Sequence, residues 1–219
     1  MYKTFRTLFN SNWHREAVGG LWDQIGKLQF DFLVAQGLKP YHNFLDVSCG
    51  SLRGGIHFIP YLEKGRYVGF DNNKKLLKAG IRELKKNNVL DKKPTLLHID
   101  NFDLSSLNTK VDYAIAQSLF THLTINEIIQ CVVNIDRILV TAGKFFATFF
   151  ENPEGKENLV PIKHETKDSR NIVTFFSRDP FHYNFETFKW VCENTNLDIN
   201  YIGDWNHPRD QKMLVFTKK

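Results

Sequence analysis

The feature that most constrains the fold of this chain is a regular alternation of short apolar runs with amphipathic segments. Apolar runs of strand length occupy residues 44–47, 66–70, 95–99, 111–116 and 144–150. Helical spacing of apolar residues predicts helices between them, over residues 54–62, 74–87 and 124–139. Strands that alternate with helices predict a parallel sheet that is covered on both faces.

The two ends of the chain modify this pattern. A leading helix is predicted over residues 15–37, within an N-terminal helical segment that spans residues 1–40. After a helix at 186–195, two extended runs, 198–205 and 213–217, are joined only by a short polar stretch. A parallel crossover needs about a dozen residues or more, so these two runs are expected to pair antiparallel. We therefore predict an α/β fold with a mostly parallel sheet, a reversed last strand and helices on both faces.

Composition predicts one globular domain over residues 1–219. Hydrophobic residues make up 42% of the chain, and 19 Phe, 7 Tyr and 4 Trp are enough to fill a large core. The net charge of +5 is too small to identify a partner. The 3 cysteines form no CxxC pair and no Cys/His cluster, which predicts a reducing compartment and no metal site. No apolar run approaches the ~20 residues that cross a bilayer, so we expect a cytoplasmic protein without a membrane partner. The oligomeric state is left open.

The most informative segment of the sequence is LDVSCGSLRGG, in which a strand ends in an acidic residue and glycines open the next helix. Glycines in such a place let the backbone approach a ligand at a helix N-terminus. A dinucleotide fingerprint would also need glycine where Ser48 and Arg53 stand, so a pyrophosphate cradle is disfavoured. A ligand with an amino-acid end fits better. Its ammonium would meet Asp46, and the loop that contains Ser48, Gly50 and Gly54 would pass beneath it.

Polar residues also end the next three predicted strands. Asp71 follows the second strand, where a carboxylate can accept both hydroxyls of a ribose. Asp100, Asn101 and Phe102 end the third strand, where the carboxylate could take an adenine amino group and the ring could cover the base. Gln117 ends the fourth. Because open α/β sheets bind ligands at the carboxyl ends of their strands, these positions together predict a site for a nucleoside that carries an amino acid.

With these motifs in place, the sequence resembles the class I, Rossmann-like S-adenosylmethionine-dependent methyltransferases over nearly its whole length. It is most similar to small bacterial-type members that read LDVGCGSLRGG, GxD after the second strand, AQSLFTHL and GDWNHPRxQKMLVF. Here these motifs read LDVSCGSLRGG, VGFD, AQSLFTHL and GDWNHPRDQKMLVF. The resemblance implies a seven-stranded sheet with a reversed last strand, S-adenosyl-L-methionine as cofactor and methyltransferase activity. Ser48 departs from the usual glycine, and a serine is expected to fit there if its φ is negative.

The resemblance also bears on the acceptor. Its association with sugar and cell-surface glycan biosynthesis predicts O-methylation of a sugar or another small molecule. No NPPY or DPPY follows the fourth strand, which argues against base amines and protein glutamine as acceptors. A nucleic-acid methyltransferase and a non-catalytic cofactor-binding protein of the same fold are the alternatives. The basic run 74–93 lies on an amphipathic helix without interleaved aromatics, which is more typical of a solvated face than of a nucleic-acid partner.

An alcohol acceptor needs a base. His122, just beyond the fourth strand, is the first candidate, and Glu151, after the fifth, is the second. The alternatives are a histidine that packs and caps the following helix, and a solvated loop carboxylate.

Two segments are candidates for covering the pocket. Residues 152–183 form a long, charged connection that we interpret as a substrate lid, with His182 and Tyr183 returning it to the pocket. A surface excursion without substrate contact is the alternative. The leading segment, with Trp13 and Trp22, could close over the cofactor or only pack a helix against the sheet.

Overall fold

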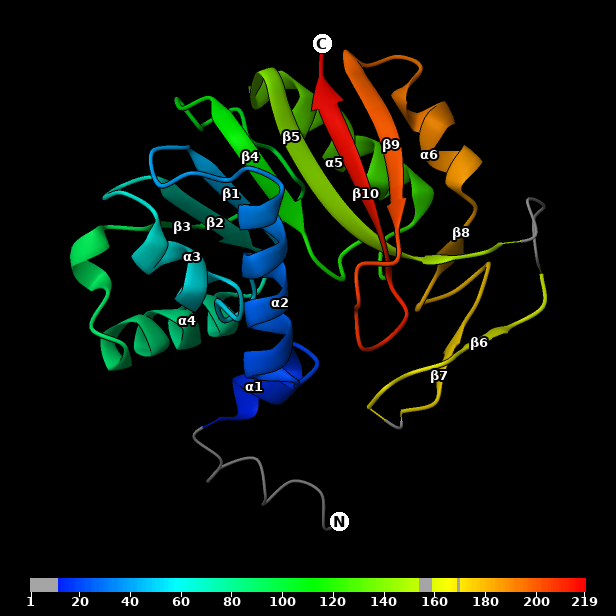
Figure 1. Ribbon diagram of the computed structural model, residues 1–219, viewed down its shortest axis with the longest axis horizontal. Coiled ribbons are helices and arrows are strands. Elements are labelled where there is room, and N and C mark those ends of the chain that lie inside the picture. The colour runs from blue at the N-terminus through cyan, green and yellow to red at the C-terminus, as the bar shows by residue number, and fades with distance from the viewer. Residues whose placement is uncertain (1–11, 154–158, 169) are drawn as a thin grey trace.

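The central sheet arises because each short apolar run of the sequence forms a strand, and the inner strands β1 and β4 are the most deeply buried of its parallel part. The strands are β1 Phe44–Val47, β2 Tyr67–Asp71, β3 Thr95–His98, β4 Val111–Ala116, β5 Leu139–Glu151, β8 His182–Tyr183, β9 Leu197–Gly203 and β10 Lys212–Lys218. In the computed structural model, which describes residues 12–153, 159–168 and 170–219, their order is β3-β2-β1-β4-β5-β10-β9, with β8 paired to β5 (Figure 1). Within the described residues of this sheet, the pairings of β10 with β5 and with β9 are antiparallel and the other pairings are parallel. The predicted mostly parallel sheet with a reversed last strand is confirmed.

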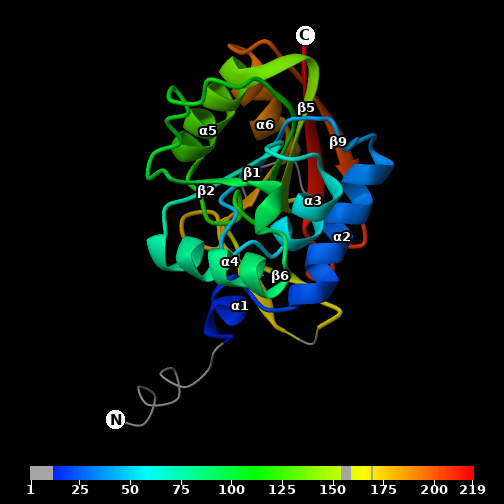
Figure 2. The same ribbon diagram turned by 90° about the vertical axis from the view of Figure 1, so that its left-hand side faces the viewer.

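Helices cover both faces of this sheet. They are α1 Trp13–Ala17, α2 Trp22–Ala35, α3 Gly55–Tyr61, α4 Lys74–Lys86, α5 Ile125–Ile138 and α6 Phe185–Cys192. Side chains alternate along each strand, so Phe44 packs with α2, α3 and α4 while Leu45 packs with α5 and α6. In the turned view, α2 and α3 lie on one side of the sheet and α5 and α6 on the other (Figure 2). Within the described part of the chain, no helix is long and apolar enough to cross a membrane.

Two helices begin at side-chain caps. The Asn73 side chain accepts a hydrogen bond from the Lys75 backbone N–H at 3.0 Å and so caps α4. At the start of α5, the Thr124 backbone N–H donates to the Glu127 carboxylate at 2.7 Å, as expected for a capping box. These caps help to define where the loops after β2 and β4 end.

The predicted leading helix over 15–37 is wrong in one respect, because it is broken into α1 and α2. Gly19 and Gly20 have φ values of +95° and +69°, and Leu21 follows at +47°. These left-handed conformations end α1, since glycine adopts them readily and a helix does not. After the break α1 docks on α4, where Arg15 donates to both carboxylate oxygens of Glu83 at 3.0 Å. Residues 1–11 of the predicted N-terminal segment lie outside the described residues.

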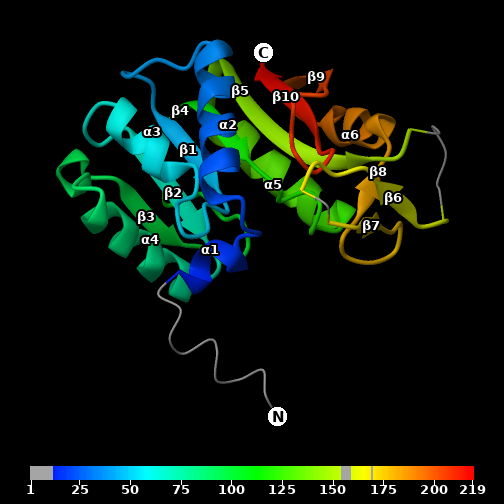
Figure 3. The ribbon, with the colours of Figure 1, turned by 60° about the horizontal axis from the view of Figure 1, so that its bottom comes forward.

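The connection at 152–183 has its own secondary structure in its described parts. An antiparallel hairpin of β6 Ile162–His164 and β7 Ile172–Thr174 leads to β8 (Figure 3). β8 pairs in parallel with the last two residues of β5. A second attachment joins the Phe181 backbone N–H to the Thr121 carbonyl at 2.7 Å. The segment is therefore anchored beside the carboxyl ends of β4 and β5.

A buried polar chain fixes the hairpin against β8. The Thr174 hydroxyl lies 2.8 Å from His164 Nε2 and 2.9 Å from His182 Nδ1. All three side chains are buried. A hydroxyl can donate to one imidazole nitrogen while it accepts from the other, so a single threonine satisfies both rings.

We expect Thr174→Val to destabilise the fold by roughly 2–4 kcal/mol, because the isosteric valine leaves two buried imidazole nitrogens without this partner. Urea unfolding measures the loss. Thr95→Val, at an exposed strand position, is the control and should change stability by less than about 0.5 kcal/mol. Equal effects of the two substitutions would contradict the role given to the Thr174 hydroxyl.

Candidate functional site

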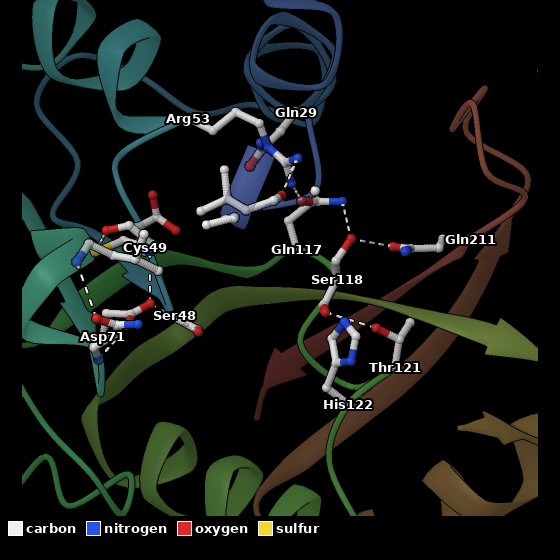
Figure 4. A pocket seen from close by; sticks show the side chains of 18 of the residues that line it. Gln29, Ser48, Cys49, Arg53, Asp71, Gln117, Ser118, Thr121, His122 and Gln211 are labelled. Carbon is white, nitrogen blue, oxygen red and sulfur yellow. Dashed lines mark hydrogen bonds between the residues drawn. The ribbon is translucent and has the colours of Figure 1, made fainter. Parts of the chain in front are cut away.

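A cavity of about 520 Å³ opens at the carboxyl ends of β1, β2 and β4 (Figure 4). β1 lies between β2 and β4, so the cavity is at the point where the strand order reverses. Open α/β sheets bind ligands at this switch point. The volume lies within the range of small-molecule sites.

The structure brings about half of the sequence-predicted site residues to this cavity. Those that line it are Asp46, Ser48, Gly50, Gly54, Asp71, Gln117 and His122. Those that do not are Asp100, Asn101, Phe102, Glu151, His182 and Tyr183. The cavity also has a wall from residues 16–19, which are the end of α1 and the start of the N-terminal loop that joins it to α2, and another from the loop that precedes β10.

The Asp71 carboxylate joins the end of β2 to the glycine loop after β1. Its Oδ2 accepts from the Gly50 backbone N–H at 2.8 Å and from the Ser48 hydroxyl at 3.2 Å. Its Oδ1 accepts from the Asn73 backbone N–H at 2.8 Å. A carboxylate offers about four acceptor positions, so Asp71 can still accept a bond from a ligand.

Ser48 occupies a position that favours glycine. Its φ is +57°, so the condition under which a serine was expected to fit, a negative φ, is not met. This left-handed conformation costs a non-glycine residue about 1–2 kcal/mol. The serine hydroxyl offsets part of that cost through its hydrogen bond to Asp71.

Asp46 is a buried acid at the end of β1. Burial raises its pKa to about 7, and the nearby charge of Asp71 adds to the rise. The Tyr67 hydroxyl donates to Asp46 Oδ2 at 2.7 Å and opposes the shift. A cationic ligand group beside Asp46 would favour its charged form.

Arg53, a residue to which the sequence analysis assigned no role, holds one wall of the cavity. Its Nη1 donates to the carbonyls of Val18 and Gly20 at 2.8 and 3.1 Å, and its Nη2 donates to the Gln117 side-chain oxygen. Burial, with a contribution from the nearby Arg209, lowers the pKa of Arg53 to about 10, so it stays cationic at neutral pH. Within the described parts of the chain its Nε has no hydrogen-bond partner. This buried cation ties the N-terminal loop to the end of β4.

A chain of hydrogen bonds connects the end of β4 to β10 (Figure 4). The Gln117 amide donates to the Ser118 hydroxyl at 2.7 Å, and that hydroxyl donates to Gln211 Oε1 at 2.8 Å. Thr148 of β5 donates to the same Gln211 oxygen at 2.8 Å. Gln211 belongs to the GDWNHPRDQKMLVF segment, so that segment contributes directly to the cavity.

The same segment supplies two more buried side chains. Arg209 lines the cavity. Its Nε donates to the Asp168 carboxylate at 2.8 Å, and its Nη2 donates to the Gly19 carbonyl at 2.5 Å. Burial lowers the pKa of His207 to about 3, helped by the charges of Arg53 and Arg209, so its ring is neutral. A polar run between two strands is the sequence signal that could have identified these residues.

The carboxyl end of β3 does not reach the cavity, because β3 lies one strand farther out than β2. Asp100 is exposed and pairs with His98 at 3.1 Å. The Asn101 side chain accepts from the Asp103 backbone N–H, and Phe102 packs against Phe70. Predicted adenine contacts from these three residues find no support in their placement.

Of the two predicted bases, only His122 lines the cavity. Its Nδ1 lies 2.6 Å from Asp179 of the 152–183 segment. The Glu151 carboxylate instead accepts from the Tyr201 hydroxyl at 2.7 Å.

The predicted substrate contacts are also placed elsewhere. His182 is buried beneath the hairpin, and the Tyr183 hydroxyl donates to the Leu123 carbonyl at 2.6 Å. From the same segment, Ile172 and Pro180 line the cavity. Among the described residues, no group of three or more His, Cys, Asp or Glu side chains could hold a metal ion.

No known protein-family profile matches the chain, but solved structures do. A methyltransferase from Clostridium acetobutylicum ATCC 824 that depends on S-adenosylmethionine is similar over 98% of both chains, with a TM-score of 0.67 and 10% identity. CalS10, an amino pentose methyltransferase from Micromonospora echinaspora with bound SAM, covers 100% of this chain and 98% of its own, with a TM-score of 0.65 and 13% identity. The chain has the Rossmann-like methyltransferase fold.

A third methyltransferase shares the fold. Magnesium protoporphyrin IX methyltransferase from Synechocystis PCC 6803, with bound SAM, is similar over 90% of this chain and 81% of its own, with a TM-score of 0.62 and 14% identity. That methyltransferase and CalS10 are named for different acceptors, a magnesium porphyrin and an amino pentose, so the shared fold does not identify the acceptor of this chain.

Substitution of Gly50 tests how closely the N-terminal loop packs against the glycine loop. Its φ is +56°, and an added Cβ would lie 2.7 Å from Val18 Cγ1. Gly65 is the matched control, with φ +80° and no atom within 4 Å of an added Cβ. Both alanine substitutions should cost about 1 kcal/mol for the backbone, and Gly50→Ala should cost about 1–2 kcal/mol more for overpacking. Urea unfolding of the two variants gives the difference, and no difference would mean that the loop moves aside freely.

Proposed function

We propose that this chain is an S-adenosylmethionine-dependent methyltransferase that methylates an oxygen of a sugar or another small molecule. The observation that carries the proposal is the cavity at the switch point, where the Asp71 carboxylate is bonded to the glycine loop. The shared fold and the SAM bound to its structural neighbours support the class. The amino pentose substrate of CalS10 supports a sugar acceptor.

The residues present suit the chemical groups of such a cofactor. Asp71 would accept the ribose hydroxyls, because it follows β2 and keeps acceptor capacity. The buried Asp46 would hold the ammonium of the amino-acid end, since an ammonium favours the ionised form of a carboxyl whose pKa is near 7. Gly50 and Gly54 line the cavity between these acids and let the cofactor lie against the loop.

The cofactor supplies a methyl group on a sulfonium, which is a good leaving group. The chain must orient the acceptor and take its proton. His122 lines the cavity and is the proposed base, whereas the Glu151 carboxylate is engaged by Tyr201.

Residues 152–183 are the proposed substrate lid. Ile172 and Pro180, which line the cavity, would contact the acceptor in place of the predicted His182 and Tyr183.

Calorimetry and an acceptor screen test the proposal. The purified chain should bind S-adenosylmethionine or S-adenosylhomocysteine at a single site, and labelled cofactor should transfer its methyl group to a sugar-containing acceptor. Binding of NAD with no binding of either ligand at millimolar concentration would contradict the cofactor. Binding without turnover on any acceptor would favour the non-catalytic alternative, and strongly salt-dependent binding of RNA or DNA would favour a nucleic-acid methyltransferase.

Asp71→Asn should weaken cofactor binding roughly 10- to 100-fold, because charge-assisted bonds to hydroxyls contribute about 1.5–3 kcal/mol. Asp103→Asn is the control, since Asp103 is an exposed turn residue that accepts from the Ser105 backbone N–H. Dissociation constants from calorimetry decide the outcome. Equal, small effects of the two substitutions would remove Asp71 from the site.

Cofactor binding should also weaken as the pH falls, because the raised pKa of Asp46 keeps its carboxyl protonated below about pH 7. An ammonium binds the ionised form, so the Kd for S-adenosylhomocysteine should rise roughly tenfold or more from about pH 7.5 to about pH 5.5. Asp46→Asn should bind weakly at both pH values and show a flat profile. A wild-type profile that is equally flat would mean that Asp46 does not contact the ammonium.

A further inference from the structure

The 152–183 segment places a carboxylate within hydrogen-bond distance of His122, the proposed base. Asp179 Oδ1 lies 2.6 Å from His122 Nδ1, although the two residues are 57 positions apart in sequence. We propose that Asp179 is a positioning residue that orients His122 and sets its tautomer, so that the segment completes a His–Asp dyad for proton transfer. This inference rests on the proposed function and adds a residue to its site.

Stability alone does not account for this pair. The side chains of His122 and Asp179 are 57% and 58% exposed, and exposed ion pairs contribute little to stability. Yet His122 lines the cavity, as does Pro180, the neighbour of Asp179. Among the described residues, the other ring nitrogen, Nε2, has no hydrogen-bond partner. The pair therefore combines an oriented Nδ1 with an unengaged Nε2 at the wall of the site.

Backbone hydrogen bonds hold both partners in place. On the β4–α5 loop, the His122 backbone N–H donates to the Leu119 carbonyl at 2.9 Å, and the Thr121 hydroxyl donates to the Ser118 carbonyl at 2.8 Å (Figure 4). Across the pair, the Phe181 backbone N–H donates to the Thr121 carbonyl at 2.7 Å. Thr121, directly before His122, is thus hydrogen-bonded to Phe181, which lies two positions after Asp179. This link holds the two backbone segments that carry His122 and Asp179 next to each other.

The dyad supplies a complete path for the proton. When Nδ1–H donates to the Asp179 carboxylate, the Nε2 lone pair is free to accept the proton of the acceptor hydroxyl. As that proton leaves, the acceptor oxygen forms its bond to the methyl carbon while the carbon–sulfur bond breaks, and the bonding electrons stay on sulfur. Asp179 stabilises the resulting imidazolium, which then returns the proton to water.

The tautomer of His122 can be measured without cofactor or acceptor. In nitrogen-15 NMR spectra of the full chain at a pH where the ring is neutral, His122 should be mainly the Nδ1–H tautomer. Asp179→Ala should shift it to the Nε2–H tautomer, which is the usual form of a free imidazole. Asp31→Ala is the control, because it removes an exposed ion pair of the same 2.6 Å length on α2, with Lys27. A wild-type ring in the Nε2–H form, or a tautomer that Asp179→Ala leaves unchanged, overturns the proposal.

Kinetics with an identified acceptor give an independent measurement. Asp179→Asn should lower kcat roughly 10- to 100-fold and leave the acceptor KM and the cofactor Kd within about twofold, because the carboxylate acts through His122. His122→Ala should lower kcat by roughly 10²–10⁴-fold. The double variant should be no slower than His122→Ala alone, since residues that act as a unit are not additive. Additive losses, or an unchanged kcat in Asp179→Asn, would overturn the proposal.

The two measurements separate this inference from the proposed function. If the chain transfers no methyl group to any acceptor, the tautomer in the ligand-free protein still decides whether Asp179 orients His122. If turnover is found and the tautomer does not respond to Asp179→Ala, the methyltransferase proposal stands and the dyad is wrong.

Discussion

One wall of the site depends on one buried guanidinium. Arg53 belongs to the glycine loop, and it donates to the carbonyls of Val18 and Gly20 and to the side chain of Gln117. A charge that is removed from water needs such partners, because an unpaired buried ion costs several kcal/mol. The hydrogen bonds that satisfy Arg53 therefore also hold the N-terminal loop over the sheet. Without them, this wall of the cavity would lose its link through Arg53 to Gln117 at the end of β4.

Acidic and cationic groups of the site come from different parts of the chain. Asp46 and Asp71 stand at the ends of parallel strands, where the sheet itself brings them together. Arg209 comes from the loop before β10 and is paired with Asp168 of the 152–183 segment. Charged side chains from loops that are far apart in sequence thus pair with one another beside the strand ends. This division suits a fold in which the cofactor side stays constant and the acceptor side varies with the loops.

The 152–183 segment contributes more to the site than a covering surface. Its hairpin is fixed by the buried chain through Thr174, its strand β8 extends the sheet, and Asp168 and Asp179 reach two functional loops. A segment with these attachments can place side chains against an acceptor reproducibly, because its position is set by buried hydrogen bonds. Acceptor specificity in this chain is accordingly expected to depend on this segment and on the loop before β10.

The sequence by itself determined the order and type of most elements outside residues 152–183, because apolar periodicity and capping residues act locally. It also identified the acids of β1 and β2, Gln117 and His122 as neighbours, since parallel strands deliver their carboxyl ends to one edge. Only the tertiary structure decided which strand ends reach the cavity, and it left out Asp100 because β3 lies at the sheet margin. The buried Arg53 and the contact of Asp179 with His122 were likewise decided there. Their physical reason is shared: each depends on loops distant in sequence that pack together and satisfy one another's polar groups, and no local pattern encodes such contacts.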